Sequence, residues 1–193
     1  MTYKIENLFP TPIYSCFLEN KDAVETEMSN ALVNVQYDDS VNYYQWGKTF
    51  ETTSVEADIL SEKQMNNLAQ AIDQHLEQYC KEIGFQKREY KRKSWIVKNS
   101  TGGHTHIHSH GEYDIAGCYY FQTTGNDGDI FFETPVSPAV SSLCYQKFTT
   151  RHEHKPEVGK LLLFPGWLAH GVKTNTVNSD RISLAFMIAF VRN

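Results

Sequence analysis

The C-terminal half of the chain constrains the fold most, because it is a succession of short runs rich in β-branched and aromatic residues. These runs begin near residue 90, and no helical pattern interrupts them. Clusters of Gly, Pro, Asn and Asp separate one run from the next. Six or more closely spaced strands predict a mainly β protein, an antiparallel sandwich or jelly roll. The runs are SWIVKN, IAGCYYFQ, GDIFFET, SLCYQKFT, GKLLLFPGWLAHGV and RISLAFMIAFV.

The N-terminal half predicts helices that support this sheet region. Residues 20–35 favour one helix, and a strand is expected after Pro12. Ser61 and Gln64 form the pattern of a capping box before a second, strongly periodic helix that Gly84 ends. We therefore expect a single domain over residues 1–193, in which residues 1–88 support a jelly-roll core over residues 89–193.

Charge and cysteine usage narrow the classes of partner and compartment. The net charge of -5 argues against nucleic-acid binding, and the longest apolar run is too short to span a bilayer. Four widely spaced cysteines form no CxxC motif, and no secretory signal precedes residue 20. These features predict a cytoplasmic protein with reduced thiols and no membrane partner, and they are compatible with a homodimer.

Four histidines occupy every second position of the stretch GGHTHIHSHGEYD: His104, His106, His108 and His110. In a strand, residues i and i+2 point the same way and lie about 6.5–7 Å apart along the chain. Two imidazoles at that spacing can bind one ion, and a third ligand from another strand leaves the opposite face of the ion open. Histidine-rich runs also bind metal without specificity, so this motif alone is weak.

A second block strengthens the metal hypothesis. His170 follows a buried apolar run sixty residues after His110, and Arg181 and Ser183 share one face of the next strand. An arginine fork suits a carboxylate, and a serine hydroxyl can donate to the same group. His170 alone is typical of a hydrogen-bonded strand end, and Arg181 alone of a surface charge. Their order after the paired histidines favours a built site instead.

With these motifs, the sequence resembles the Fe(II)- and 2-oxoglutarate-dependent oxygenase superfamily, in its prolyl-4-hydroxylase-like branch. More closely, it is similar to a group of such oxygenases found in bacteria and phages. The resemblance spans nearly the whole chain and implies a double-stranded β-helix packed on N-terminal helices. It rests on LFPTPIY at the start, Trp95, an HxH pair followed by Gly and YY, FPGWLAH over residues 164–170, and RISLAF over residues 181–186.

The resemblance also implies roles for individual residues. Counted from the tryptophan and the YY pair of related sequences, the metal ligands are His108, His110 and His170, whereas His104 and His106 are upstream neighbours. The distal carboxylate of 2-oxoglutarate would bind the side chains of three residues, namely Arg181, Ser183 and Tyr120, with Tyr120 a better match than Tyr119.

One position departs from the superfamily pattern. The second member of the pair is usually Asp or Glu, whereas this chain has His110. Either three neutral imidazoles hold the iron, or Asp114 or Glu112 supplies the anionic ligand; we favour the three histidines. The second cluster, His152 and His154, is interpreted as exposed.

The resemblance implies a dioxygenase that uses Fe(II), O2 and 2-oxoglutarate to hydroxylate an unknown small molecule or protein side chain, with succinate as a product. Because imidazoles must be neutral to bind metal, iron affinity is expected to fall as the pH drops through roughly 6–7. Two alternatives stay open. One is a non-catalytic jelly-roll binding or structural protein that retains the metal pocket, and the other is a three-histidine dioxygenase that needs no 2-oxo acid.

Overall fold

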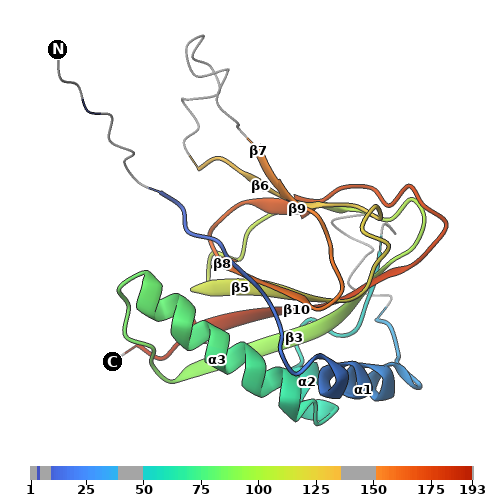
Figure 1. The fold of residues 1–193 in the computed structure, drawn as a ribbon, viewed down its shortest axis with the longest axis horizontal. Helices are drawn as coiled ribbons and strands as arrows, with labels where there is room; N and C mark the ends of the chain where they lie inside the picture. Colours follow the sequence, from blue (N-terminus) through green and yellow to red (C-terminus); the bar gives the residue numbers. More distant parts are fainter. Residues whose placement is uncertain (1–3, 5–9, 39–49, 136–150, 193) are drawn as a thin grey trace.

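The computed structural model describes residues 4, 10–38, 50–135 and 151–192, and its core is two facing antiparallel β-sheets (Figure 1). This confirms the predicted mainly β jelly roll. The larger sheet has the order β1 (Tyr14–Phe17), β8 (Lys160–Pro165), β5 (Ile115–Gln122), β10 (Arg181–Phe190), β3 (Tyr90–Asn99) and β2 (Glu51–Thr52). The smaller sheet has the order β4 (Thr105–His108), β9 (His170–Val172), β6 (Ile130–Glu133) and β7 (Arg151–His154).

The central strands of the larger sheet are buried on both faces, because each face meets a different layer. On β8, Leu161 and Leu163 belong to the core beneath the helices, whereas Leu162 and Phe164 belong to the core between the sheets. Strand side chains alternate between faces, so the run KLLLFP supplies both cores at once.

The helices cover the face of the larger sheet that is turned away from the smaller sheet (Figure 1). They are α1 (Lys21–Leu32), α2 (Ile59–Glu62) and α3 (Asn66–Glu82). Their apolar side chains, including Met28, Leu68 and Leu76, form one core cluster with Tyr119 of β5. Within the described part of the chain, none of the helices has the length and apolar character needed to cross a membrane.

The predicted capping box is wrong, because the helix breaks where the box was expected. Ser61 lies inside the short helix α2 and donates to Asp58 Oδ2 at 2.6 Å, and Gln64 has a φ of 53°. The carboxylate of Glu27, on α1, instead accepts hydrogen bonds from the backbone N–H groups of Asn67 and Leu68 at 2.8 and 3.0 Å. A tertiary contact therefore caps α3, which no local pattern in the sequence indicates.

Two of the other predicted strands are confirmed, and one observed strand was not predicted. The run IAGCYYFQ coincides with β5, and RISLAFMIAF coincides with β10. The run SLCYQKFT, residues 142–149, lies outside the described residues. Strand β7, with the sequence RHEH, was not predicted because it lacks apolar alternation; it pairs with β6 along its length.

Gly117 gives a direct test of how tightly the larger sheet and its covering side chains pack. A Cβ at this position would lie 2.5 Å from the Leu162 carbonyl oxygen and 2.8 Å from Phe186 Cε2. We expect Gly117→Ala to lower the free energy of unfolding by about 1–3 kcal/mol, the usual cost of overpacking. Gly111→Ala is the matched control, because a Cβ there meets nothing within 4 Å. Urea unfolding of the metal-free proteins measures both changes, and equal stabilities would contradict the packing argument.

Candidate metal centre and carboxylate pocket

An extra residue in β4 decides which histidines enter the space between the sheets. Thr105 pairs with Val172 and His108 pairs with His170, with a register shift between the two pairs. Three steps along β4 therefore match two steps along β9, which is a β-bulge. The bulge reverses the alternation of side chains, so Thr105 and His108 both line the cavity.

His104 and His106 consequently lie outside this cavity. Their Nε2 atoms are 3.3 Å apart, their rings meet edge to face at 4.7 Å, and the His106 side chain is exposed. Neither residue lines the cavity between the sheets. The four histidines that look equivalent in the sequence thus divide into an inner and an outer pair.

Backbone carbonyls fix the tautomers of two inner histidines. The Nδ1 atom of His108 lies 2.9 Å from the His106 carbonyl oxygen, and the Nδ1 atom of His170 lies 2.8 Å from that of Leu168. A carbonyl only accepts, so Nδ1–H is the donor in each neutral ring. Each Nε2 therefore keeps its lone pair, which is the state that a metal ligand requires.

The turn after β4 brings in His110. Its backbone N–H donates to the Gly166 carbonyl at 2.7 Å, and its own carbonyl accepts from Tyr113 N–H at 2.9 Å. A Cβ on Gly166 would clash with the Tyr113 carbonyl group and lie 3.0 Å from the His110 carbonyl oxygen. The absence of a side chain at Gly166 thus lets the His110 turn close onto the β8–β9 turn. Trp167, the next residue along the chain, is 53% exposed and does not line the cavity.

The structure brings His108, His110 and His170 together. One ring nitrogen from each lies within 4.8 Å of the other two. The ring centroids are 4.4 Å apart for His108 and His170, 4.9 Å for His108 and His110, and 5.2 Å for His110 and His170. Among the described residues, no further His, Cys, Asp or Glu joins this group. Three imidazoles that converge in this way can hold a transition metal ion.

The two carboxylates considered as substitutes for His110 lie elsewhere. Asp114 Oδ2 accepts from the backbone N–H of Phe190 at 2.8 Å, which fixes the end of β10. Glu112 is exposed in the turn after His110. The alternative in which either of them completes the cluster does not agree with this geometry.

Burial keeps the three imidazoles neutral. It lowers the pKa of His170 to about 3, with a further contribution from His108. Burial, and then His108, lowers the pKa of His110 to about 4. The pKa of His108 is also lowered by burial. The expectation that protons displace the metal at pH 6–7 therefore moves to lower pH, because these groups are already neutral there.

Arg181 lies in the same cavity and is almost completely buried. Its Nη1 donates to the Gly128 carbonyl at 2.6 Å, and its Nη2 donates to Asn99 Oδ1 at 2.7 Å. Its Nε has no hydrogen-bond partner. Among the residues that the structure describes, no carboxylate forms an ion pair with Arg181. A buried cation without an anion is costly, so the site is suited to an anionic ligand.

Two hydroxyl groups lie beside Arg181 on the cavity side of the larger sheet. Ser183 follows Arg181 on the same face of β10, and Tyr120 lies opposite Ser183 on β5. Burial raises the pKa of Tyr120 well above its usual value, so the phenol keeps its proton and can donate. Tyr119, the other candidate, points to the opposite face and packs in the core beneath the helices.

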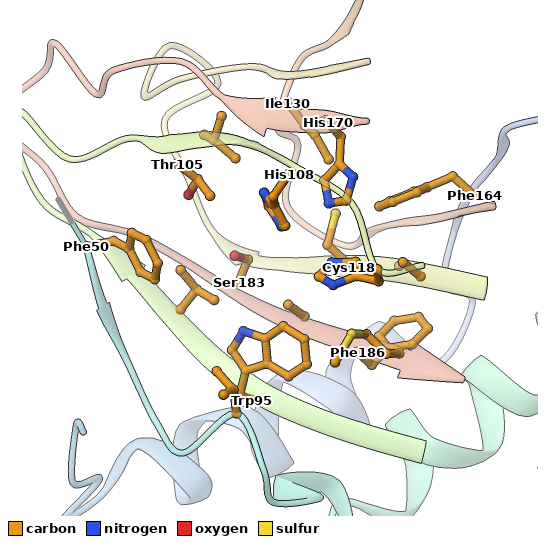
Figure 2. Close-up of a pocket in the computed structure, with 18 of the residues that line it drawn as sticks. Phe50, Trp95, Thr105, His108, Cys118, Ile130, Phe164, His170, Ser183 and Phe186 are labelled. Carbon is orange, nitrogen blue, oxygen red and sulfur yellow. The ribbon is translucent and has the colours of Figure 1, made fainter. Parts of the chain in front are cut away.

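The cavity that holds both groups has a volume of about 330 Å³ and lies between the two sheets (Figure 2). Arg181, Ser183 and Tyr120 line it together with the three histidines. Sequence reasoning missed Asn99, which orients the guanidinium, and Thr105. Both residues could be found only from the pairing register between strands that are distant in sequence, and a single sequence does not reveal that register.

Comparisons with known proteins agree with this arrangement. Residues 93–187 match the family described as "Putative 2OG-Fe(II) oxygenase". A comparison with curated protein sequences gave no match.

Several solved structures share the fold at low identity. HygX from Streptomyces hygroscopicus, solved with nickel and 2-oxoglutarate, is 13% identical with a TM-score of 0.66 over 94% of this chain and 84% of HygX. The epimerase SnoN from nogalamycin biosynthesis is 11% identical with a TM-score of 0.65, covering 93% and 77% of the two chains. A Pseudomonas putida prolyl-4-hydroxylase is 12% identical with a TM-score of 0.58, covering 94% and 89%.

These structures establish the shared jelly-roll fold. The match over residues 93–187 adds what fold alone does not, because it spans the strands that carry the histidine cluster and Arg181. Residues 93–187 thus match the 2-oxoglutarate- and Fe(II)-dependent oxygenases, which confirms the resemblance that the motifs of the sequence indicated.

Proposed function

We propose that the protein is a dioxygenase that hydroxylates an as yet unidentified substrate and converts 2-oxoglutarate and O2 to succinate and CO2. His108, His110 and His170 would hold Fe(II) through one ring nitrogen each. Arg181, Ser183 and Tyr120 would bind the distal carboxylate of 2-oxoglutarate.

The observation that carries this proposal is the buried Arg181 in the same cavity as the three histidines. Its guanidinium has an unpartnered Nε, and no carboxylate among the described residues forms an ion pair with it or lines the cavity. A dicarboxylate that reaches from the metal to Arg181 would neutralise this charge. A dioxygenase that uses no 2-oxo acid, or a binding protein with an idle pocket, offers no such use for a buried cation.

In the proposed dioxygenase, the residues around the 2-oxoglutarate site have distinct roles. Asn99 and the Gly128 carbonyl hold the guanidinium in one orientation before the ligand arrives. Ser183 and the protonated Tyr120 supply hydroxyl donors for the same carboxylate. The apolar walls exclude water, which strengthens each of these interactions. Bound iron would supply the activation of O2 and the oxidation of a C–H bond.

The charge at the metal also differs from that of a site with a carboxylate ligand. Three neutral imidazoles would leave a bound Fe(II) ion with its full dipositive charge until the co-substrate binds. The 2-oxo acid would then supply the compensating negative charge. Co-substrate binding therefore changes the electrostatics of this site more than it would in a site with a carboxylate ligand.

Anaerobic titration with Fe(II) and 2-oxoglutarate tests the carboxylate clamp. The wild-type protein is expected to develop a visible charge-transfer band, which requires that the oxo acid chelate the iron. Arg181→Ala should weaken 2-oxoglutarate binding by about 30-fold or more, because loss of one partner of a buried charge pair costs about 2–5 kcal/mol. Arg151→Ala, on exposed β7, is the matched control. The absence of this band from the wild-type protein would contradict the proposal. An undiminished band in Arg181→Ala protein that still binds Fe(II) would contradict it as well.

Iron affinity should be nearly independent of pH down to about pH 6 and should fall only as the pH approaches 4. The reason is that burial lowers the pKa of His110 to about 4 and that of His170 to about 3. Protons therefore compete with the metal for these rings only at a pH near those values. In the unfolded chain the imidazoles keep an ordinary pKa of about 6.5, so the apo-protein also loses stability as the pH falls below that value. Anaerobic Fe(II) titrations between pH 5 and 8, with circular dichroism of the apo-protein, measure both effects. An affinity midpoint near pH 6.5 would contradict this expectation.

A further inference from the structure

The cavity face of the larger sheet changes from polar to apolar along β10. At the polar end, Arg181 lies opposite Asn99 of β3, and Ser183 lies opposite Tyr120 of β5. At the apolar end, Ala185 and Met187 replace them on the same face of β10. Arg181 and Ala185 are four residue steps apart along the strand, which is about 13 Å. The two ends of the cavity therefore present different chemistry to a ligand.

The histidine cluster is adjacent to the apolar end. His110 meets the indole of Trp95 at a ring-centroid distance of 6.3 Å and an interplanar angle of 68°. Trp95 itself lies opposite Ala185 in the sheet. Arg181, by contrast, is bonded to the carbonyl of Gly128, in the turn before β6. A co-substrate that reaches from the metal to Arg181 thus leaves the Trp95 side of the cavity to the substrate.

An apolar wall lines this second side. Trp95, Val97 and Met187 form a separate hydrophobic cluster, against which Phe50 and Val55 pack. All five residues line the cavity. Among the described residues of the lining, the one permanently charged side chain is Arg181, at the other end. An ionised group placed against this wall would lose its hydration without a counterion, which is strongly unfavourable.

One polar atom is available in the wall. Figure 2 draws the indole of Trp95 with its nitrogen edge directed into the pocket. Within the part of the chain that the structure describes, no acceptor is hydrogen-bonded to this Nε1–H. The indole nitrogen of tryptophan is a donor only, and it usually finds a partner when buried. The wall therefore offers one donor to a bound molecule.

We propose that Phe50, Val55, Trp95 and Met187 form the subsite for the group that is oxidised, and that this subsite takes an uncharged, mainly apolar moiety with one hydrogen-bond acceptor. This inference rests on the proposed function, whose co-substrate occupies the Arg181 end. The recognised chemistry can come from a free small molecule or from a side chain in a peptide.

Capped single-residue amides test the selectivity. The probes are N-acetyl amides of leucine, lysine and glutamate, each also placed in the centre of a capped pentapeptide whose other residues are glycine. Thermal shift of the metal-free protein measures binding without any need for turnover. Anaerobically, a change in the charge-transfer band of the Fe(II)–2-oxoglutarate protein reports binding beside the metal. The leucine probes should bind about tenfold more tightly than the charged ones, because burial of a leucine side chain is worth that much.

A charge placed in the wall should switch this preference. Val55→Asp should favour the lysine probe over the leucine probe, a gain that misfolding cannot imitate. Val191→Asp, at an exposed position outside the cavity, is the matched control and should keep the wild-type order. Trp95→Phe keeps an apolar ring but removes the N–H donor that would bind an amide carbonyl oxygen of the probe. It should therefore weaken the binding of the leucine probes several-fold.

The experiments distinguish a failure of the proposed function from a failure of the apolar subsite. No charge-transfer band with 2-oxoglutarate overturns the proposed function, and the thermal shifts then decide whether the apolar subsite stands. A band together with equal responses to leucine, lysine and glutamate, or with no response to any probe, overturns the subsite alone. If single residues do not bind and peptides do, the moiety is presented by a polypeptide, and the subsite as proposed is upheld.

Discussion

The pairing of β10 with β3 on one side and β5 on the other is the constraint on which the site depends. It continues from Arg181 to Phe190 along β3, and it places Ser183 opposite Tyr120. Because the strand is buried on both faces, one side anchors the helices while the other carries the cavity. A shift of one residue would turn Arg181 away from the cavity and toward the apolar core beneath the helices. The position of the guanidinium is thus fixed by the packing of the whole sheet.

Short apolar runs made the strands of the core predictable from the sequence, whereas contacts between distant segments were not predictable. Leu161 to Phe164 read as a strand because each of its residues meets an apolar layer. The true start of α3 was hidden, because its cap is the carboxylate of Glu27 on another helix. The cluster of His108, His110 and His170 followed from a resemblance of motifs. The partners of Arg181, by contrast, required the register between β3 and β10, which strand patterns do not encode.

The site combines groups that would be unfavourable separately. Three imidazoles share a space from which burial excludes their charged forms, as the lowered pKa values of His110 and His170 indicate. Arg181 is a permanent cation in the same cavity. Without ligands the cavity holds one positive charge and no described negative charge, so it is poised to take up an anion together with a metal. Binding of these ligands to the folded protein would therefore raise its free energy of unfolding.

The extra residue in β4 has a consequence for how such a site can change. The histidines of this stretch recur every second residue, so a regular strand would offer all of them to the same face and leave the choice of ligands undetermined. The irregularity between Thr105 and His108 makes that choice by geometry. Without this irregularity, the same amino acids in a regular strand would turn His104 and His106 to the same face as His108. The identity of the metal ligands in this protein is therefore encoded in the register of β4 as much as in side-chain chemistry.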